Sequence, residues 1–233
     1  MPEALKWDQT GERQAEQGVD HGVVYPYNGT TRAYDKGVAW NGLTGVTESP
    51  SGAEPTDLWA DNIKYLTMRS AEQYGFSIEA FMYPDEFAEC DGTASAADGV
   101  IVHQQARRTF GFCYRTNVIN DTMSEEDDGY KLHLIWGASA SPTEKSHTTM
   151  NESPSNETFN WTCTTTPVTL STTDPKTGKP FKPTAVITIN SLAVDSEKLA
   201  ALETILYGSN EADAMLPSPD DVLAMFMTNQ ANG

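Results

Sequence analysis

The chain contains few cysteines, and their spacing excludes two common roles for that residue. Cys90, Cys113 and Cys163 are odd in number, far apart and without a C-x-x-C pair. This pattern argues against a disulfide framework or a zinc site and fits folding in a reducing compartment. No stretch approaches the roughly 20 apolar residues that a membrane span requires, so no membrane partner is expected.

Residues that carry catalysis or bind metals do not fall into familiar patterns. The histidines at 21, 103, 133 and 147 lack the spacing of metal ligands. His133 alternates with apolar neighbours and is predicted to be solvated on the polar face of a strand. No G-x-S-x-G segment positions a nucleophilic serine. The acidic cluster at 125–128 lacks the alternating ligands of a calcium loop and predicts a solvated hairpin tip. The sequence therefore predicts no catalytic residue, no cofactor and no metal site.

Basic residues are scarce relative to acidic ones. Fifteen Lys and Arg stand against 33 Asp and Glu, which gives a formal net charge of -18. A surface this negative repels the phosphates of nucleic acids and anionic lipids. Two interpretations remain open: a well-solvated acidic surface, or a surface that stays close to DNA without binding it.

Short segments that alternate between apolar and polar residues are abundant. In 130–136, for example, Tyr130, Leu132, Leu134 and Trp136 oppose Lys131 and His133. Such alternation, rich in aromatic and β-branched residues, is typical of half-buried antiparallel strands. The clearest segments are 74–82, 108–115, 130–136 and 158–164, and the weaker ones are 22–27, 37–46, 62–69 and 184–190. They predict a mainly β fold, an antiparallel sandwich or barrel.

Helical signals are concentrated near the C-terminus. Helices are expected at 195–207, capped by Asp195 or Ser196 and stopped by Gly208, and at 219–228. Pro84 could open a single helical turn. Residues 1–18 are expected to form a flexible arm before one domain at 19–233. They contain no apolar segment that a translocon could read, which predicts synthesis in a cytoplasm. Long polar loops are expected at 47–57, 139–157 and 171–183, a length usually associated with function or a partner.

The order of the aromatic strands and polar loops resembles a known family, the major tail proteins (tail tube proteins) of long, non-contractile-tailed bacteriophages of Gram-positive hosts. The likeness covers roughly residues 20–191, and its most specific parts are YPDEFAEC and ASPTEK. The segments that carry it are GVAWNGLTGVTESPSGAEPTDLWADNIKYL (37–66), YGFSIEAFMYPDEFAECDG (74–92), QQARRTFGFCYRT (104–116), YKLHLIWGASASPTEKSHTTMNESP (130–154), FNWTCTTTPV (159–168) and PTAVITINS (183–191).

The resemblance implies a β-sandwich or barrel of the tail tube type with a flanking helix, and a structural protein of the virion made in the bacterial host cytoplasm. Its copies would form hexameric rings that stack into a hollow tube, through which DNA passes without specific binding. Further partners would be the tape measure, tail terminator and distal tail proteins. The resemblance implies no enzyme activity and no cofactor.

By position, the family's loop between early strands, which reaches neighbouring subunits and rings, corresponds to 47–61 of this chain. The candidate interface residues are Glu48, Pro50, Glu54, Trp59 and Asp61. Trp59 could instead fill the core of its own subunit, because large aromatic residues serve both roles. Two other functions also remain open: a related secretion-system tube protein and a carbohydrate-binding β-sandwich.

Overall fold

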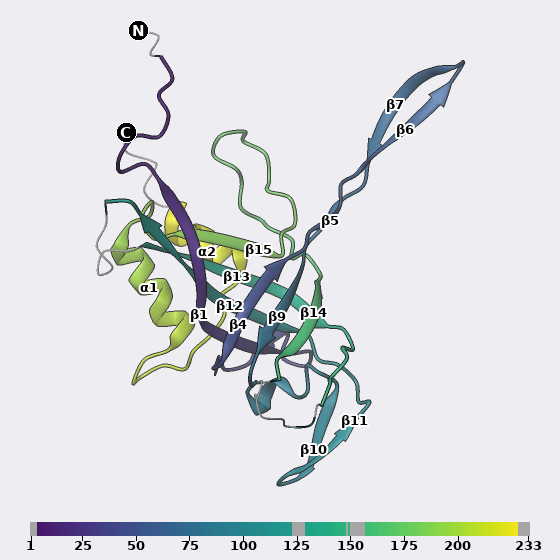
Figure 1. Cartoon of the computed structure of the whole chain (residues 1–233), viewed down its shortest axis with the longest axis vertical. Coiled ribbons are helices and arrows are strands. Elements are labelled where there is room, and N and C mark those ends of the chain that lie inside the picture. The colour runs from purple at the N-terminus through teal and green to yellow at the C-terminus, as the bar shows by residue number, and fades with distance from the viewer. Residues whose placement is uncertain (1–3, 123–128, 148, 150–156, 228–233) are drawn as a thin grey trace.

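The computed structural model describes residues 4–122, 129–147, 149 and 157–227 (Figure 1). The acidic cluster at 125–128 lies outside these residues, as do 148 and 150–156 of the expected loop at 139–157. The described chain is mainly β, with antiparallel strands and two short α-helices, as the sequence predicts.

The elements follow one another along the chain from an N-terminal strand to two C-terminal helices. The strands are β1 (Gln14–Asn28), β2 (Ala33–Tyr34), β3 (Val38–Trp40), β4 (Leu43–Glu48), β5 (Ser51–Gly52), β6 (Pro55–Ala60), β7 (Ile63–Arg69), β8 (Glu72–Gln73), β9 (Gly75–Ala80), β10 (Thr93–Ala97), β11 (Val100–His103), β12 (Phe110–Asn120), β13 (Gly129–Ala140), β14 (Phe159–Thr165) and β15 (Val186–Asn190). The helices are η1 (Asp85–Phe87), a single 3₁₀ turn, α1 (Ser196–Tyr207) and α2 (Pro219–Met227).

Nine of the strands form one sheet that rolls around a core. Its order is β2-β1-β12-β13-β14-β9-β4, with β3 paired to β1 and β15 paired to β13. Trp40 of β3 and Trp161 of β14 belong to distant parts of this order, yet their ring centroids lie only 5.4 Å apart. The sheet must therefore curl until its two sides face each other.

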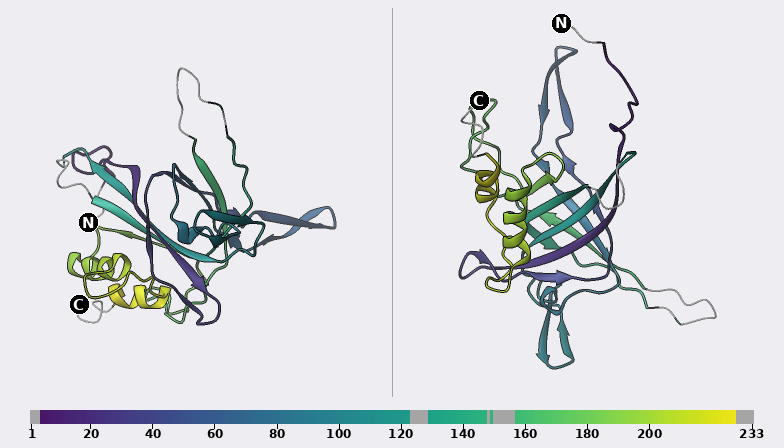
Figure 2. Two further views of the ribbon diagram at one scale, coloured as in Figure 1. Left: turned by 90° about the horizontal axis from the view of Figure 1, so that it is seen from below. Right: turned by 90° about the vertical axis from the view of Figure 1, so that its left-hand side faces the viewer.

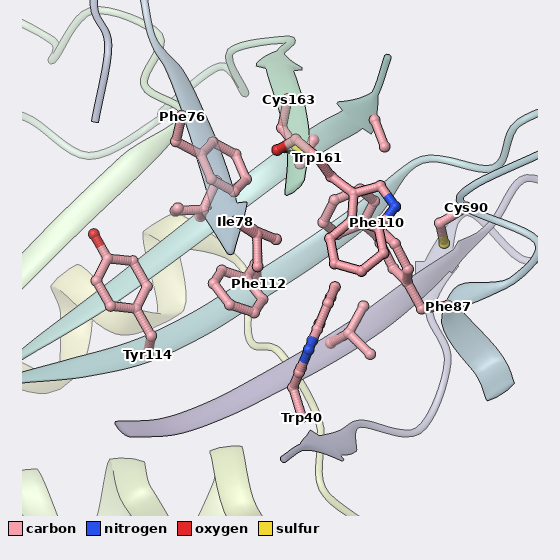
Figure 3. Close-up of a cluster of buried hydrophobic side chains, with 14 of the residues drawn as sticks. Trp40, Phe76, Ile78, Phe87, Cys90, Phe110, Phe112, Tyr114, Trp161 and Cys163 are labelled. Atoms are coloured by element: carbon pink, nitrogen blue, oxygen red, sulfur yellow. Dashed lines mark hydrogen bonds between the residues drawn. The ribbon is translucent and has the colours of Figure 1, made fainter. Parts of the chain in front are cut away.

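The inner core is built largely from aromatic side chains (Figure 3). Phe110 and Phe112 of β12 point inward, as the alternation predicts, and Trp161 faces them from β14. Phe87 of η1 contacts Phe110 and Trp161 edge-on and Trp40 at a tilt, at centroid distances of 4.5 to 5.3 Å. Tilted ring pairs of this kind add about 0.5–1.5 kcal/mol each beyond the burial of their area.

A second core lies on the outer face of the sheet, beneath the two helices (Figure 2). Leu199, Leu202 and Leu206 of α1 pack in this cluster with Leu132 and Leu134 of β13. Because both faces of β12 and β13 are covered, these strands are buried more fully than the half-buried strands that the sequence predicts.

Most predicted elements are present. Every predicted strand segment contains a strand, although 37–46 is divided between β3 and β4 at Gly42, whose φ is +76°. The helices expected at 195–207 and 219–228 correspond to α1 and α2, as far as Met227. Asp195 caps α1, as one of the two alternatives predicted.

The expected N-terminal arm is too long by several residues. β1 begins at Gln14, and residues 14–17 pair with Asn117–Asn120 of β12. These residues are exposed and, except for Ala15, polar, so they give no alternating apolar signal in the sequence. Residues 14–18 therefore belong to the sheet, and the arm is shorter than 1–18.

Candidate assembly surface

The segment expected to be a loop at 47–61 is instead half of a long hairpin. β4 runs through β5 into β6, and β7 returns through β8 into β9. The resulting projecting hairpin (residues 51–73) extends away from the rolled sheet (Figure 1). Its Pro, Gly and Ser residues give the sequence the composition of a loop, which hides the strands.

The tip of the projecting hairpin is a two-residue turn. Asp61 and Asn62 have φ values of +52° and +62°, and Ala60 pairs with Ile63 across them. Positive φ at both central residues matches the twist of the flanking strands, and Asp and Asn tolerate it better than most residues. Asp61, a predicted interface residue, therefore shapes the tip and lies exposed there.

One face of the projecting hairpin is formed by apolar side chains. Leu58 pairs with Leu66, and Thr56 pairs with Met68, so these three apolar side chains share a face. The apolar hairpin face is completed at the tip and consists of Leu58, Ala60, Ile63, Leu66 and Met68. Leu58 and Leu66 are 42% exposed, Met68 is 55% and Ile63 is 60%. Large apolar side chains that are exposed together, with polar groups beside them, mark interaction sites.

The opposite face, called the polar face, carries mainly polar side chains together with Trp59. The Asp57 carboxylate accepts a hydrogen bond from the Thr67 hydroxyl at 2.7 Å and lies 2.8 Å from Lys64 Nζ. The Lys64 ammonium and the Thr67 hydroxyl hold the pKa of Asp57 below its usual value. These contacts link the two strands across this face, and its polar groups remain accessible to water.

Trp59 lies on the polar face, opposite Lys64, and is 68% exposed. The alternative in which it fills the core of its own subunit is therefore wrong. A bulge next to Trp59 leaves Tyr65 without a cross-strand partner in the ladder, and Tyr65 is 69% exposed. That Trp59 anchors a neighbouring subunit stays a prediction.

The other predicted interface residues are distributed along the hairpin and are not gathered into one cluster. Pro50 lies between β4 and β5, and Glu54 lies between β5 and β6; both are exposed. Glu48 ends β4 at the root of the hairpin, where its Oε1 accepts a hydrogen bond from the Tyr114 hydroxyl at 2.9 Å. Glu48 thus joins the hairpin to the sheet.

His133 lies beside Glu48 at this root, and the prediction that it is solvated is wrong. Its ring stacks on Tyr114, with centroids 4.5 Å apart and planes 4° apart, and the residue is only 7% exposed. Its Nε2 lies 3.1 Å from the Thr116 hydroxyl, and its Nδ1 lies 3.3 Å from that of Thr188. Burial lowers the pKa of His133 despite the nearby Glu48 carboxylate. β15, which pairs with β13 here, helps to cover a position that alternation alone marks as polar.

A second hairpin is formed by β10 and β11 (residues 93–103), where the alternation pattern predicts no strand. It projects at the opposite end of the molecule from the first (Figure 1). Val100, Ile101 and Val102 are each about half exposed. Asp98-Gly99 before these apolar residues is a recognised hairpin turn signal and could have predicted it.

The described residues offer little for metal or thiol chemistry. They contain no group of three or more His, Cys, Asp or Glu side chains that could hold a metal ion. The three cysteines are free and buried, and burial raises the pKa of the Cys90 and Cys113 thiols to about 12. Within the same residues no helix is long and apolar enough to cross a membrane.

Comparison of the chain with protein-family models and with curated proteins gives no match.

Proposed function

We propose that this chain is the tail tube protein of a long, non-contractile-tailed bacteriophage. In this proposal it is a structural protein of the virion, without enzymatic activity or a cofactor. Six copies form a ring, and the rings stack into the tube through which the genome leaves the capsid. The resemblance of residues 20–191 to this family motivates the proposal, and the projecting hairpin is the observation that supports it best.

A hairpin with one apolar face is poorly suited to exist alone in water. Two-stranded hairpins are marginally stable unless a third strand or another surface covers them. Fully burying a Leu or Met side chain contributes about 1.5–3 kcal/mol. Several such side chains on the apolar hairpin face would stabilise a contact between subunits, and they account for a hairpin that contributes nothing to either core.

The charge of the chain suits a conduit for DNA. Acidic side chains that face the lumen would repel passing phosphates and prevent capture of the genome. Screening limits this effect to about 8–10 Å at physiological ionic strength, so only acids close to the lumen contribute. The interpretation of the charge as a surface that stays near DNA without binding it is part of this proposal.

The experiment compares the wild-type chain with a hairpin-face variant, in which Leu58, Leu66 and Met68 are replaced by threonine. Threonine keeps a high strand propensity but removes most of the apolar surface. The wild type is expected to form rings and tubes in negative-stain electron microscopy. The hairpin-face variant should keep the wild-type circular dichroism spectrum and urea midpoint but form no tubes.

Ile205→Thr is the matched control, because Ile205 is an apolar side chain of similar exposure on α1, away from the hairpin. It should assemble like the wild type. A wild-type chain that stays monomeric at every concentration would overturn the proposed function. Glycan binding by that monomer would favour the carbohydrate-binding alternative.

A further inference from the structure

The second hairpin, like the first, has one apolar face. Ala94 pairs with Val102, and Ala97 pairs with Val100, which places these four side chains together. Ser95 and His103 lie on the other face with Ile101. Val100 is 52% exposed and Val102 is 45% exposed. The apolar face of the second hairpin is therefore a compact patch that nothing in the described chain covers.

The two hairpins lie at opposite ends of the long axis of the molecule. Figure 1 places that axis vertically, with β6 and β7 at the top and β10 and β11 at the bottom, and the right-hand view of Figure 2 shows the same separation. A copy displaced along this axis therefore brings its lower hairpin toward the upper hairpin of the copy below. Contacts between two different surfaces of identical chains generate filaments when they do not close into a ring, as for copies displaced along one axis.

Both hairpins are nearly neutral segments of a strongly acidic chain. Residues 55–69 contain two acids and two bases, and residues 93–103 contain one acid and no Lys or Arg, whereas the whole chain carries -18. Two copies repel each other wherever their acidic surfaces meet, and neutral apolar hairpins are where they can approach. This distribution favours a second copy of the chain as the partner of these faces, since a basic partner would bind the acidic surface instead.

We infer that the apolar face of the second hairpin in one copy binds the apolar hairpin face of the next copy along the tube axis. The contact is head to tail, so each copy uses its two hairpins on two different neighbours. The inference rests on the proposed function, because it assigns the surface that receives the projecting hairpin when rings stack.

The test uses two variants that are each blocked at one end. The hairpin-face variant lacks the first surface, and a second-hairpin variant, Val100→Thr with Val102→Thr, lacks the other. Ile101→Thr is the matched control, because Ile101 is equally exposed but lies on the opposite face of the same hairpin. Circular dichroism and urea unfolding establish that all variants fold.

The second-hairpin variant should need a protein concentration at least about tenfold higher than the wild type to form tubes, since a few well-packed apolar residues dominate such contacts. Ile101→Thr should behave like the wild type. A mixture of the two blocked variants should form particles of two stacked rings but nothing longer than that, because the mixture retains one intact pair of surfaces.

A cross-link gives an independent measurement. Met68→Cys and Val102→Cys are prepared in separate copies and mixed under mild oxidation, and the native cysteines are buried and should not react. A disulfide should form between the two kinds of copy at least about tenfold more than within either kind alone.

The outcomes separate this inference from the proposed function. Normal tubes from the second-hairpin variant would overturn the inference and leave the tail tube proposal intact. Stacked pairs of rings formed by the second-hairpin variant alone would also overturn the inference, because they would show a contact between two hairpins of the same kind. Head-to-tail fibres without rings would support the inference and contradict the proposed function. A wild-type chain that never self-associates would overturn both.

Discussion

At the scale of single residues, the root of the projecting hairpin depends on a small polar cluster. Tyr114 donates its hydroxyl hydrogen to Glu48, and the Glu48 carboxylate lies 3.4 Å from Nδ1 of His133. His133 stacks on the same tyrosine. The last residue of β4 is thereby fixed to β12 and β13, so the direction in which the hairpin leaves the sheet is set by side chains as well as by strand pairing.

The burial of His133 predicts a pH dependence of stability. Its pKa in the folded chain lies below the ordinary value of 6.5, so below that pH the unfolded chain binds more protons than the folded one. The contribution of His133 is complete above pH 6.5 and is lost as the pH falls toward the folded-state pKa. The loss is at most about 1.4 kcal/mol per pH unit. Urea unfolding of the dilute, unassembled chain at a series of pH values measures it.

The matched variant is His133→Gln, whose amide can still bond to a threonine hydroxyl but does not titrate. Its free energy of unfolding should fall less steeply than that of the wild type between pH 6.5 and 5.5. The contributions of Asp and Glu cancel when the two slopes are subtracted. Equal slopes would show that His133 does not titrate in this range.

At the scale of elements, α1 has a clear N-terminal cap. Asp195 Oδ1 accepts hydrogen bonds from the backbone N–H groups of Glu197 and Lys198, at 3.0 and 3.1 Å. Asp195→Ala should lower the free energy of unfolding by about 1 kcal/mol. Asp195→Asn, which keeps the acceptor, should recover most of it, as urea denaturation would measure. Equal losses for both variants would assign the effect to charge.

The sequence predicts most elements of the rolled sheet because most of them have a one-sided apolar pattern. The burial of the phenylalanines of β12 and of the leucines of β13 follows from alternation alone, although alternation does not show that the leucines belong to a second core. The Asp195 cap and the apolar stripe of α1 are equally local signals. None of these predictions requires knowledge of distant contacts.

The assembly surface is predicted less completely, because the information that defines it is not local. The sequence indicates that 47–61 matters and that Trp59 is an anchor candidate, but it does not show that β5 and β6 pair with β8 and β7. It also cannot show that Leu66 and Met68 remain exposed, since an alternating segment normally indicates burial. The sequence does not predict the burial of His133 for the related reason that β15 covers it from elsewhere in the chain.

At the scale of the whole molecule, net charge opposes assembly. A charge of -18 on each copy makes copies repel one another, whereas the inferred contact between hairpins is apolar and nearly neutral. Raising the salt concentration from 0.01 to 0.1 M shortens the screening length from about 30 to about 10 Å. The concentration needed for tube formation should therefore fall as salt is added.

Sedimentation of tubes at several salt concentrations measures this effect. The hairpin-face variant serves as the control, because screening cannot restore an apolar contact that has been removed. Tubes that dissolve as salt is added would show that ion pairs hold the copies together, and this would contradict the apolar contact.

The continuity of the projecting hairpin with the sheet has a mechanical consequence. β4 and β9 run from the hairpin into the rolled sheet, and β9 pairs with β14 along Phe159–Thr164. A pull on the hairpin tip acts along both strands, so it loads the ladder between β9 and β14 in shear. The hydrogen bonds of a sheared ladder resist together, whereas a ladder that is peeled open breaks one bond at a time. A contact made at the hairpin is thus anchored in the strongest direction of the sheet.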